Sequence, residues 1–366
     1  MNAVGINIYG GGFTVGVRRQ KFKVLQHLEE IKLGRDTFTL NFPDIPRQLT
    51  DWSAWPVVKD VQLVYANPPC VPWSYASSYS QRTGQIGTKK GKTVVHRFAD
   101  PLLELTYHTQ THAMKIRPDF FISESVENAY DLGAPHYEPY MKAWMRRGYS
   151  VTYFLTDATL HGAPCRRRRF HFIAHRHQLQ LPPVPKVERA TTVRDAIWDL
   201  RKRKLEDEPV FQHWPVNAGQ WNKPRYRKWL RKCEPYQVLR RAIPPREEFK
   251  GVMPSILCRK QAWDIPAHTV VRFHNMIHPD GERFVTYREG MRLMSYPDDF
   301  RVYKHRQIDA CDAVIPAVAT VLAGMARRTI DKGRKVKRPE FTVVDWRPLG
   351  EKLSGKAALE AVRGTR

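Results

Sequence analysis

Cysteine is scarce in this sequence. The 366 residues include five cysteines, which are Cys70, Cys165, Cys233, Cys258 and Cys311. Their number is odd, they are widely spaced, and no CxxC pair occurs among them. Disulfide frameworks and cysteine zinc sites need paired, regularly spaced thiols. We therefore expect a protein of a reducing compartment, without a disulfide framework and without a bound metal.

Long apolar runs are also lacking. The longest, residues 312–323, contains a charge and a proline, so no segment is expected to span a bilayer. The N-terminus has no charged start followed by an apolar core, as a signal peptide would have. These absences predict a cytoplasmic protein with no membrane partner.

Acidic residues are few relative to basic ones. Asp and Glu number 36 against 61 Lys and Arg, which gives a formal net charge of +25. A surface so basic favours a polyanionic partner, most plausibly nucleic acid. With 42% hydrophobic and 11% aromatic residues, the composition is that of a globular protein and excludes a wholly disordered basic tail.

Short apolar runs alternate with amphipathic stretches as far as about residue 185. Five runs have the length of strands, at 5–9, 23–28, 61–66, 119–123 and 169–174. Strands that alternate with helical segments predict an α/β sheet with helices on both faces. In such sheets the ligand lies outside the carboxyl ends of the strands. Gly10–Gly12 and Cys70 fall at such ends, where a cofactor and a reactive group are expected.

Composition divides the chain into four parts. We expect a first domain over 1–188 and a smaller, irregular domain with a hinge over 189–300, rich in Lys, Arg, Trp and Tyr. Residues 301–330 contain an apolar helical stretch that can return to complete the first domain. Residues 331–366 begin with a basic cluster and are expected to form a peripheral C-terminal extension.

Cys70 is the first candidate for chemistry. It follows two prolines at a predicted strand end, so its sulfur would be held in a fixed direction. A thiolate is a strong nucleophile where positive charge lowers its pKa. An inert buried cysteine is the alternative explanation.

Glu124 and Arg166–Arg169 are weaker candidates. Glu124 comes directly after another strand, where a carboxyl can donate or accept a proton, although a solvated acid at a helix start would explain it or Glu127 equally well. Alternation along Arg166–Arg169 sends two guanidinium groups to each face, so one pair can point into a cleft. A solvated charge run is the ordinary outcome for such a sequence.

The order and spacing of these motifs resemble the DNA (cytosine-5) methyltransferase family from about residue 5 to about 328. The matching segments are the glycine loop 9–16, the Asn-Pro-Pro-Cys motif 67–74, Glu124-Ser-Val126, the arginine motif 162–169, the stretch 277–300 and Cys311-Asp-Ala-Val314. The resemblance implies a Rossmann-like, S-adenosylmethionine-dependent methyltransferase sheet over 1–188. It also implies that 189–300 is a target-recognition domain.

The resemblance implies a role for each matching residue. Cys70 would attack C6 of a cytosine that has been flipped out of the duplex, while Glu124 would bind its N3. Arg167 would hold the base or the glutamate, and Arg169 would support Glu124. C5 would then take a methyl group from S-adenosylmethionine or a modified form of it. The residues expected at the cofactor are Tyr9, Gly10, Gly11, Gly12, Phe13, Glu29, Glu30, Asp51, Pro69, Asp312 and Ala313.

Double-stranded DNA is the partner that the resemblance implies, bound by a monomer. Candidate DNA-binding residues lie in the loop 80–92 and in the second domain: Arg82, Lys89, Lys90, Lys92, Arg227, Arg231, Arg240 and Lys260. Their side chains can meet phosphates, although a solvated surface position explains any single one of them as well.

The sequence departs from the family's pattern chiefly at the cofactor. The glycine loop is about two residues shorter, and Cys311 and Asp312 stand where the family has Gly and Asn. Two other functions therefore stay open: a pseudo-methyltransferase that only binds DNA, and a cytosine C5-modifying enzyme with a different donor. Structured RNA in place of DNA is a further alternative.

Overall fold

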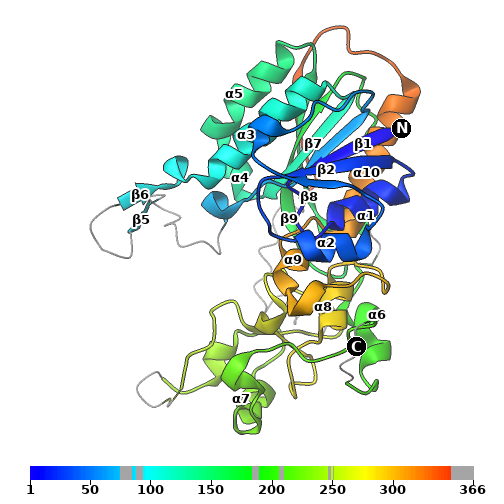
Figure 1. The fold of residues 1–366 in the computed structure, drawn as a ribbon. Helices are drawn as coiled ribbons and strands as arrows, with labels where there is room; N and C mark the ends of the chain where they lie inside the picture. Colours follow the sequence, from blue (N-terminus) through cyan, green and yellow to red (C-terminus); the bar gives the residue numbers. More distant parts are fainter. Residues whose placement is uncertain are drawn as a thin grey trace.

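The structure is a computed structural model that describes residues 1–74, 85–87, 94–183, 189–205, 210–245, 249 and 251–347. A larger part is built on a sheet, and a second part consists of short helices and loops (Figure 1). The strands are β1 Asn2–Ile6, β2 Lys23–Glu29, β3 Arg47–Leu49, β4 Leu63–Ala66, β5 Gln85–Gly87, β6 Val94–His96, β7 Phe120–Val126, β8 Ser150–Asp157, β9 Arg168–His175, β10 Arg259–Lys260, β11 Met276–Ile277 and β12 Phe341–Asp345. The helices are α1 Gly12–Arg19, α2 Arg35–Asn41, α3 Leu102–Ile116, α4 Asn128–Asp131, α5 Ala134–Met145, α6 Val193–Ile197, α7 Arg227–Lys232, α8 Tyr287–Leu293, α9 Gln307–Cys311 and α10 Pro316–Lys332.

Eight strands form the main sheet, in the order β12-β8-β9-β7-β4-β1-β2-β3. The strands β7, β4, β1, β2 and β3 pair in parallel, whereas β9 runs antiparallel between β7 and β8. From β1 the chain adds β2 and then β3 toward one edge of the sheet. It then returns to β4, beside β1, and the later strands of the sheet lie toward the other edge. The loops that follow β1 and β4 therefore lie at a topological switch point, which is the usual ligand position in such sheets.

Helices cover both faces of the sheet, as Figure 1 shows for α1 and α10 on one side and α3 and α5 on the other. The α1–α10 contact is close because residue 16 is glycine: a Cβ there would lie 2.4 Å from the backbone of Ala319. Strands β4 and β8 are buried along their whole length, as expected for a sheet covered on both faces. The α/β fold predicted from the sequence is confirmed.

The C-terminal segment differs from the expected peripheral extension. Residues Phe341–Asp345 pair in parallel with β8 and form the eighth strand of the sheet. The ring centroids of Phe341 and Tyr153 are 4.8 Å apart, and those of Trp346 and Phe154 are 5.0 Å apart. The reason is local: Thr342-Val343-Val344 is a short β-branched run, and it covers the edge of β8 that would otherwise be unpaired.

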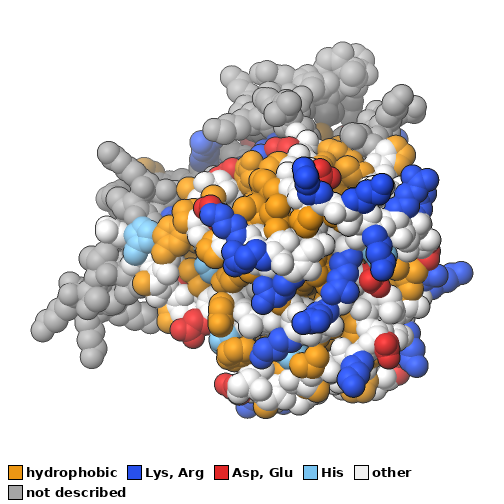
Figure 2. Space-filling model, turned by 90° about the horizontal axis from the view of Figure 1, so that it is seen from above, with side chains coloured by type: hydrophobic (Ala, Val, Ile, Leu, Met, Phe, Trp, Pro, Cys, Tyr) orange, Lys and Arg blue, Asp and Glu red, His pale blue; other side chains and the backbone are white. Residues whose placement is uncertain are grey.

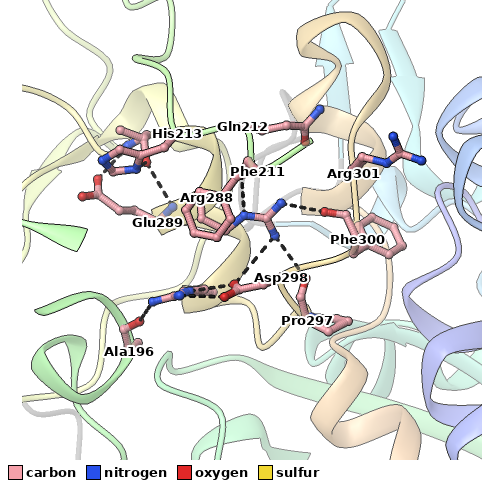
Figure 3. Close-up of polar contacts among 12 residues, drawn as sticks. Ala196, Phe211, Gln212, His213, Arg288, Glu289, Pro297, Asp298, Phe300 and Arg301 are labelled. Atoms are coloured by element: carbon pink, nitrogen blue, oxygen red, sulfur yellow. Dashed lines mark hydrogen bonds and ion pairs between the residues drawn. The ribbon is translucent and has the colours of Figure 1, made fainter. Parts of the chain in front are cut away.

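The second part has few regular elements, and polar side chains fix its loops. Figure 3 shows Arg288 of α8, which is fully buried and donates hydrogen bonds to the carbonyls of Phe211 at 2.7 Å, Pro297 at 3.1 Å and Phe300 at 3.0 Å. A buried guanidinium is tolerated where its N–H groups find acceptors in this way. The helix begins with a capping box between Thr286 and Glu289. Among the described residues, no helix is long and apolar enough to cross a membrane.

Candidate active site

A cavity of about 730 Å³ lies at the carboxyl edge of the sheet, where the two parts meet. The sheet part contributes Tyr9, Cys70, Glu124, Arg167, Arg169 and Asp312 to its wall, and the second part contributes Leu257, Thr269, Val271 and Arg272. The four residues that the sequence predicted as catalytic thus border one space.

Cys70 stands at the entrance of a short helical turn, Val71–Trp73, directly after β4 and the two prolines. Its side chain is partly exposed to the cavity, whereas the other four cysteines are buried. Burial, and to a smaller extent the charge of the neighbouring Glu124 carboxyl, raises the pKa of the Cys70 thiol to about 11, against the opposing charge of Arg169. The thiol therefore holds its proton at neutral pH in the DNA-free protein.

Glu124 lies near the end of β7 and is 2% exposed. One carboxyl oxygen accepts a hydrogen bond from Asn67 Nδ2 at 2.8 Å, and the other lies 2.7 Å from Arg169 Nε. Burial raises the pKa of Glu124, and the charges of Arg169 and Arg167 oppose that rise. Asn67 was not among the predicted site residues, although it opens the motif that contains Cys70.

Buried Arg167 and half-buried Arg169 act differently. Arg169 on β9 faces Glu124, because β9 runs antiparallel beside β7. The Arg167 guanidinium donates to three backbone carbonyls, those of Cys311 at 3.0 Å, Ala313 at 3.3 Å and Val270 at 3.3 Å. Arg167 therefore joins the α9–α10 connection to the second part, and it influences Glu124 through its charge.

The glycine loop after β1 is tightly enclosed. A Cβ at Gly10 would lie 2.6 Å from the carbonyl oxygen of Asp309, and a Cβ at Gly12 would lie 2.2 Å from that of Val314. Gly11 has a φ of +98°, a conformation that favours glycine. The neighbouring Phe13 packs in the core rather than at the cavity.

The two acids at the end of β2, Glu29 and Glu30, point in different directions. Glu29 is buried and accepts from the backbone N–H of Ile8 at 3.1 Å, with Arg47 at 3.6 Å, and burial raises the pKa of this carboxyl to about 7. Glu30 instead bonds to His108 of α3 at 2.9 Å. Since His108 stacks on Trp52, Glu30 comes to the same side of the loop as Asp51.

Exposed Asp51 caps the turn Trp52–Ala54 by accepting a hydrogen bond from the N–H of Ser53.

The tightly packed glycine loop and the carboxylates described above suit a ligand that carries hydroxyl and amino groups, as S-adenosylmethionine does. Among the described residues, no group of three His, Cys, Asp or Glu side chains is placed to hold a metal ion.

Asp312, which stands where the family has Asn, has a partner that the sequence did not reveal. Its carboxylate pairs with both ends of the Arg272 guanidinium, at 2.6 and 3.2 Å. The added negative charge is therefore compensated, which explains how the departure is tolerated at the cavity wall. Arg272 lies in an irregular segment without a recognisable motif.

The predicted DNA-binding residues fall into three groups. Arg227 and Arg240 are exposed, whereas exposed Arg231 is held by Glu282 at 2.7 Å. Lys260 is 8% exposed within β10, so the structure does not place it on an accessible surface: its Nζ lies beside Gly281. Arg82, Lys89, Lys90 and Lys92 lie outside the described residues.

Comparison with known proteins identifies the family. The model of the C-5 cytosine-specific DNA methylases matches residues 4–331. The chain belongs to this family. It is 24% identical to the type II methyltransferase M.XorII of Xanthomonas oryzae, over 99% of this chain and 93% of that protein. It is 23% identical to M.MthTI of Methanothermobacter thermautotrophicus, over 88% of this chain and 94% of that protein.

Solved structures share the fold. A prophage-encoded Escherichia coli protein, assigned as a DNA modification methyltransferase, has a TM-score of 0.66 at 18% identity, over 90% of this chain and 99% of its own. The Dnmt2 methyltransferase of Schizosaccharomyces pombe has a TM-score of 0.56 at 11% identity, over 90% of this chain and 99% of its own. Family membership confirms the enzyme class that the sequence predicted, a cytosine-5 DNA methyltransferase.

Proposed function

We propose that this methyltransferase flips a cytosine out of double-stranded DNA into the 730 Å³ cavity and methylates its C5. The observation that supports this proposal best is the joint position of Cys70, Glu124 and Arg169 on one cavity wall. A base inside the duplex exposes neither C6 nor its Watson–Crick edge to such a wall, so it must leave the stack. The cavity volume lies within the range typical of ligand sites, about 300–1,000 Å³.

The residues of the chain handle the protons of the reaction. The Cys70 thiol gives up its proton to solvent, and the sulfur forms a bond to C6 while the C5–C6 π bond breaks and its electron pair moves toward C5 and N3. Burial raises the pKa of Glu124, which favours its protonated form, and a protonated carboxyl can donate a hydrogen bond to N3. Arg169 and Asn67 hold the carboxyl in place. S-adenosylmethionine would supply the methyl group to C5. Transfer of the C5 proton to solvent then re-forms the C5–C6 double bond and breaks the C6–S bond, and Cys70 leaves as a thiolate that takes up a proton.

An exposed apolar loop at the cavity mouth supports a DNA partner. Val252 is 72% exposed and Ile256 is 65% exposed, while the adjacent Leu257 lines the cavity. Backbone hydrogen bonding between Leu239 and Cys258 brings exposed Arg240 close to this loop. Apolar side chains flanked by arginines are typical of proteins that enter a groove and unstack bases, so we propose this loop as the DNA-facing segment that the sequence did not reveal.

The test is incubation of the full chain with duplex DNA and labelled S-adenosylmethionine, followed by nucleoside mass spectrometry. We expect 5-methylcytosine from the wild type and none from Cys70→Ala. Glu124→Gln should lower kcat by about 10²-fold or more, the size of a lost general acid. Glu127→Gln is the matched control, since Glu127 pairs with Arg347 instead, and it should stay within about threefold of wild type.

Other products would decide against the proposal. Labelled methyl groups found on RNA alone would show that structured RNA is the substrate. A C5 adduct other than methyl would indicate a different donor. DNA binding without any modified nucleoside would favour a pseudo-methyltransferase. Modification that survives Cys70→Ala would refute the nucleophile.

A further inference from the structure

Tyr9 has a backbone conformation that residues other than glycine seldom adopt. It lies in the loop between β1 and α1 with a φ of +53°, in the left-handed region. Its surroundings fix this conformation from two sides. A Cβ on Gly34 would lie 2.1 Å from the Tyr9 carbonyl carbon, and the N–H of Gly10 donates to Asp309 at 3.2 Å. A bulky residue held in such a conformation next to a cavity suggests a function.

The Tyr9 side chain points into the cavity rather than to solvent. It is 7% exposed, and it borders the same space as Cys70, Glu124 and Asp312. Burial raises the pKa of its hydroxyl well above the ordinary value, and Cys70 and Asp312 raise it further, so the phenol is uncharged. A neutral aromatic ring thus reaches from the glycine loop toward the nucleophile.

The methyl donor needs the same space. Under the proposed function, on which this inference rests, the donor lies at the glycine loop and delivers its methyl group to a base at Cys70. Group transfer requires the two reacting atoms to be in near contact. The reactive end of the donor must therefore lie between the loop and Cys70, in the cavity whose wall both Tyr9 and Cys70 form.

We propose that the Tyr9 ring gates the methyl-donor site, so that S-adenosylmethionine binds fully only after the ring turns away. Because Gly34 and Gly10 hold the backbone, the movement is a rotation about the side-chain bonds. The cost of that rotation lowers the apparent donor affinity, as for any site whose competent state is partly populated. Tyr9 is thus a residue that determines donor affinity.

Calorimetric binding of S-adenosylmethionine and S-adenosylhomocysteine to the full chain tests the gate. Tyr9→Gly removes the ring and suits the positive φ, and we expect both ligands to bind at least about tenfold more tightly. Tyr9→Phe keeps the ring and should bind within twofold of wild type. Unchanged or weaker binding by a folded Tyr9→Gly protein would overturn the proposal, because the ring would then be a wall of the donor site. Should Tyr9→Gly fail to fold, Tyr9→Ala carries the same expectation.

Lys21→Gly is the matched control. Lys21 has a φ of +58° in an exposed turn after α1, so glycine relieves the same kind of strain away from the cavity. Its donor affinity should equal that of wild type, and a gain equal to that of Tyr9→Gly would refute the gate. If Tyr9→Gly binds the donor more tightly but the wild type forms no 5-methylcytosine, the proposed function is rejected and the gate proposal stands. The opposite pattern, 5-methylcytosine without tighter binding, rejects the gate alone.

Discussion

Cys70 combines a sulfur that reaches a cavity with a thiol that keeps its proton. The raised pKa of about 11 means that the thiolate forms only when the pH rises far above neutrality or when DNA changes the surroundings. Arg169 already opposes this rise by its charge, but much of that charge is shared with Glu124. Under the proposed function, Cys70 is therefore activated during the reaction rather than stored as a thiolate.

Alkylation measures this directly in the DNA-free protein. At pH 7 a thiol with a pKa of about 11 has on the order of 10²-fold less thiolate than a free cysteine, so iodoacetamide should react with Cys70 about that much more slowly. The rate should rise about tenfold per pH unit toward pH 10, since the neutral thiol loses its proton as pH rises. Peptide mass spectrometry locates the adduct, and Cys70→Ser is the control because the other cysteines are buried. A rate that is already constant above pH 8 would contradict the raised pKa.

At the scale of helices and strands, the sequence predicted the candidate site residues that lie at the ends of apolar strands. Cys70 follows β4 and Glu124 lies close to the end of β7, and the parallel pairing of these neighbours brings their carboxyl ends together. The partner of Asp312 could not be predicted in this way, because Arg272 lies in a segment with no strand or helix period. The direction of the Tyr9 side chain was equally hidden, since it depends on a positive φ that the loop sequence does not specify.

The Arg272–Asp312 pair links the second part to the connection between α9 and α10. Its side chains are 26% and 32% exposed, so solvent screens the pair and we expect a coupling free energy of about 1 kcal/mol. Urea unfolding of Arg272→Gln, Asp312→Asn and the double variant measures it. The exposed bidentate pair of Arg231 and Glu282 is the control and should give under about 0.5 kcal/mol. Equal coupling free energies for the two pairs would show that the position of Arg272 and Asp312 at the cavity wall does not strengthen their interaction.

Basic side chains are spread over one face of the molecule. Lys and Arg are more frequent than Asp and Glu on the face seen in Figure 2, and they are scattered over it rather than gathered in one patch. A net charge of +25 attracts DNA over the whole surface, whereas a defined site needs arginines beside the cavity mouth. Exposed Arg240 and Arg241 follow Leu239, whose N–H donates to the carbonyl of Cys258 directly after the apolar loop at residues 252–257.

Salt dependence separates the broad charge from these local contacts. Each phosphate contact contributes a slope of about −0.9 to the dependence of log affinity on log salt, so about six contacts weaken binding about 10³-fold between 50 and 200 mM salt. We expect a loss of this size for duplex DNA, measured by fluorescence anisotropy. Replacing Arg240 and Arg241 by Gln should reduce the slope by about two contacts. Exposed Arg117 lies before β7, at the opposite edge of the sheet, so Arg117→Gln should leave the slope unchanged. An equal effect of all three arginines would mean that binding follows net charge alone, and that the loop beside the cavity does not face the DNA.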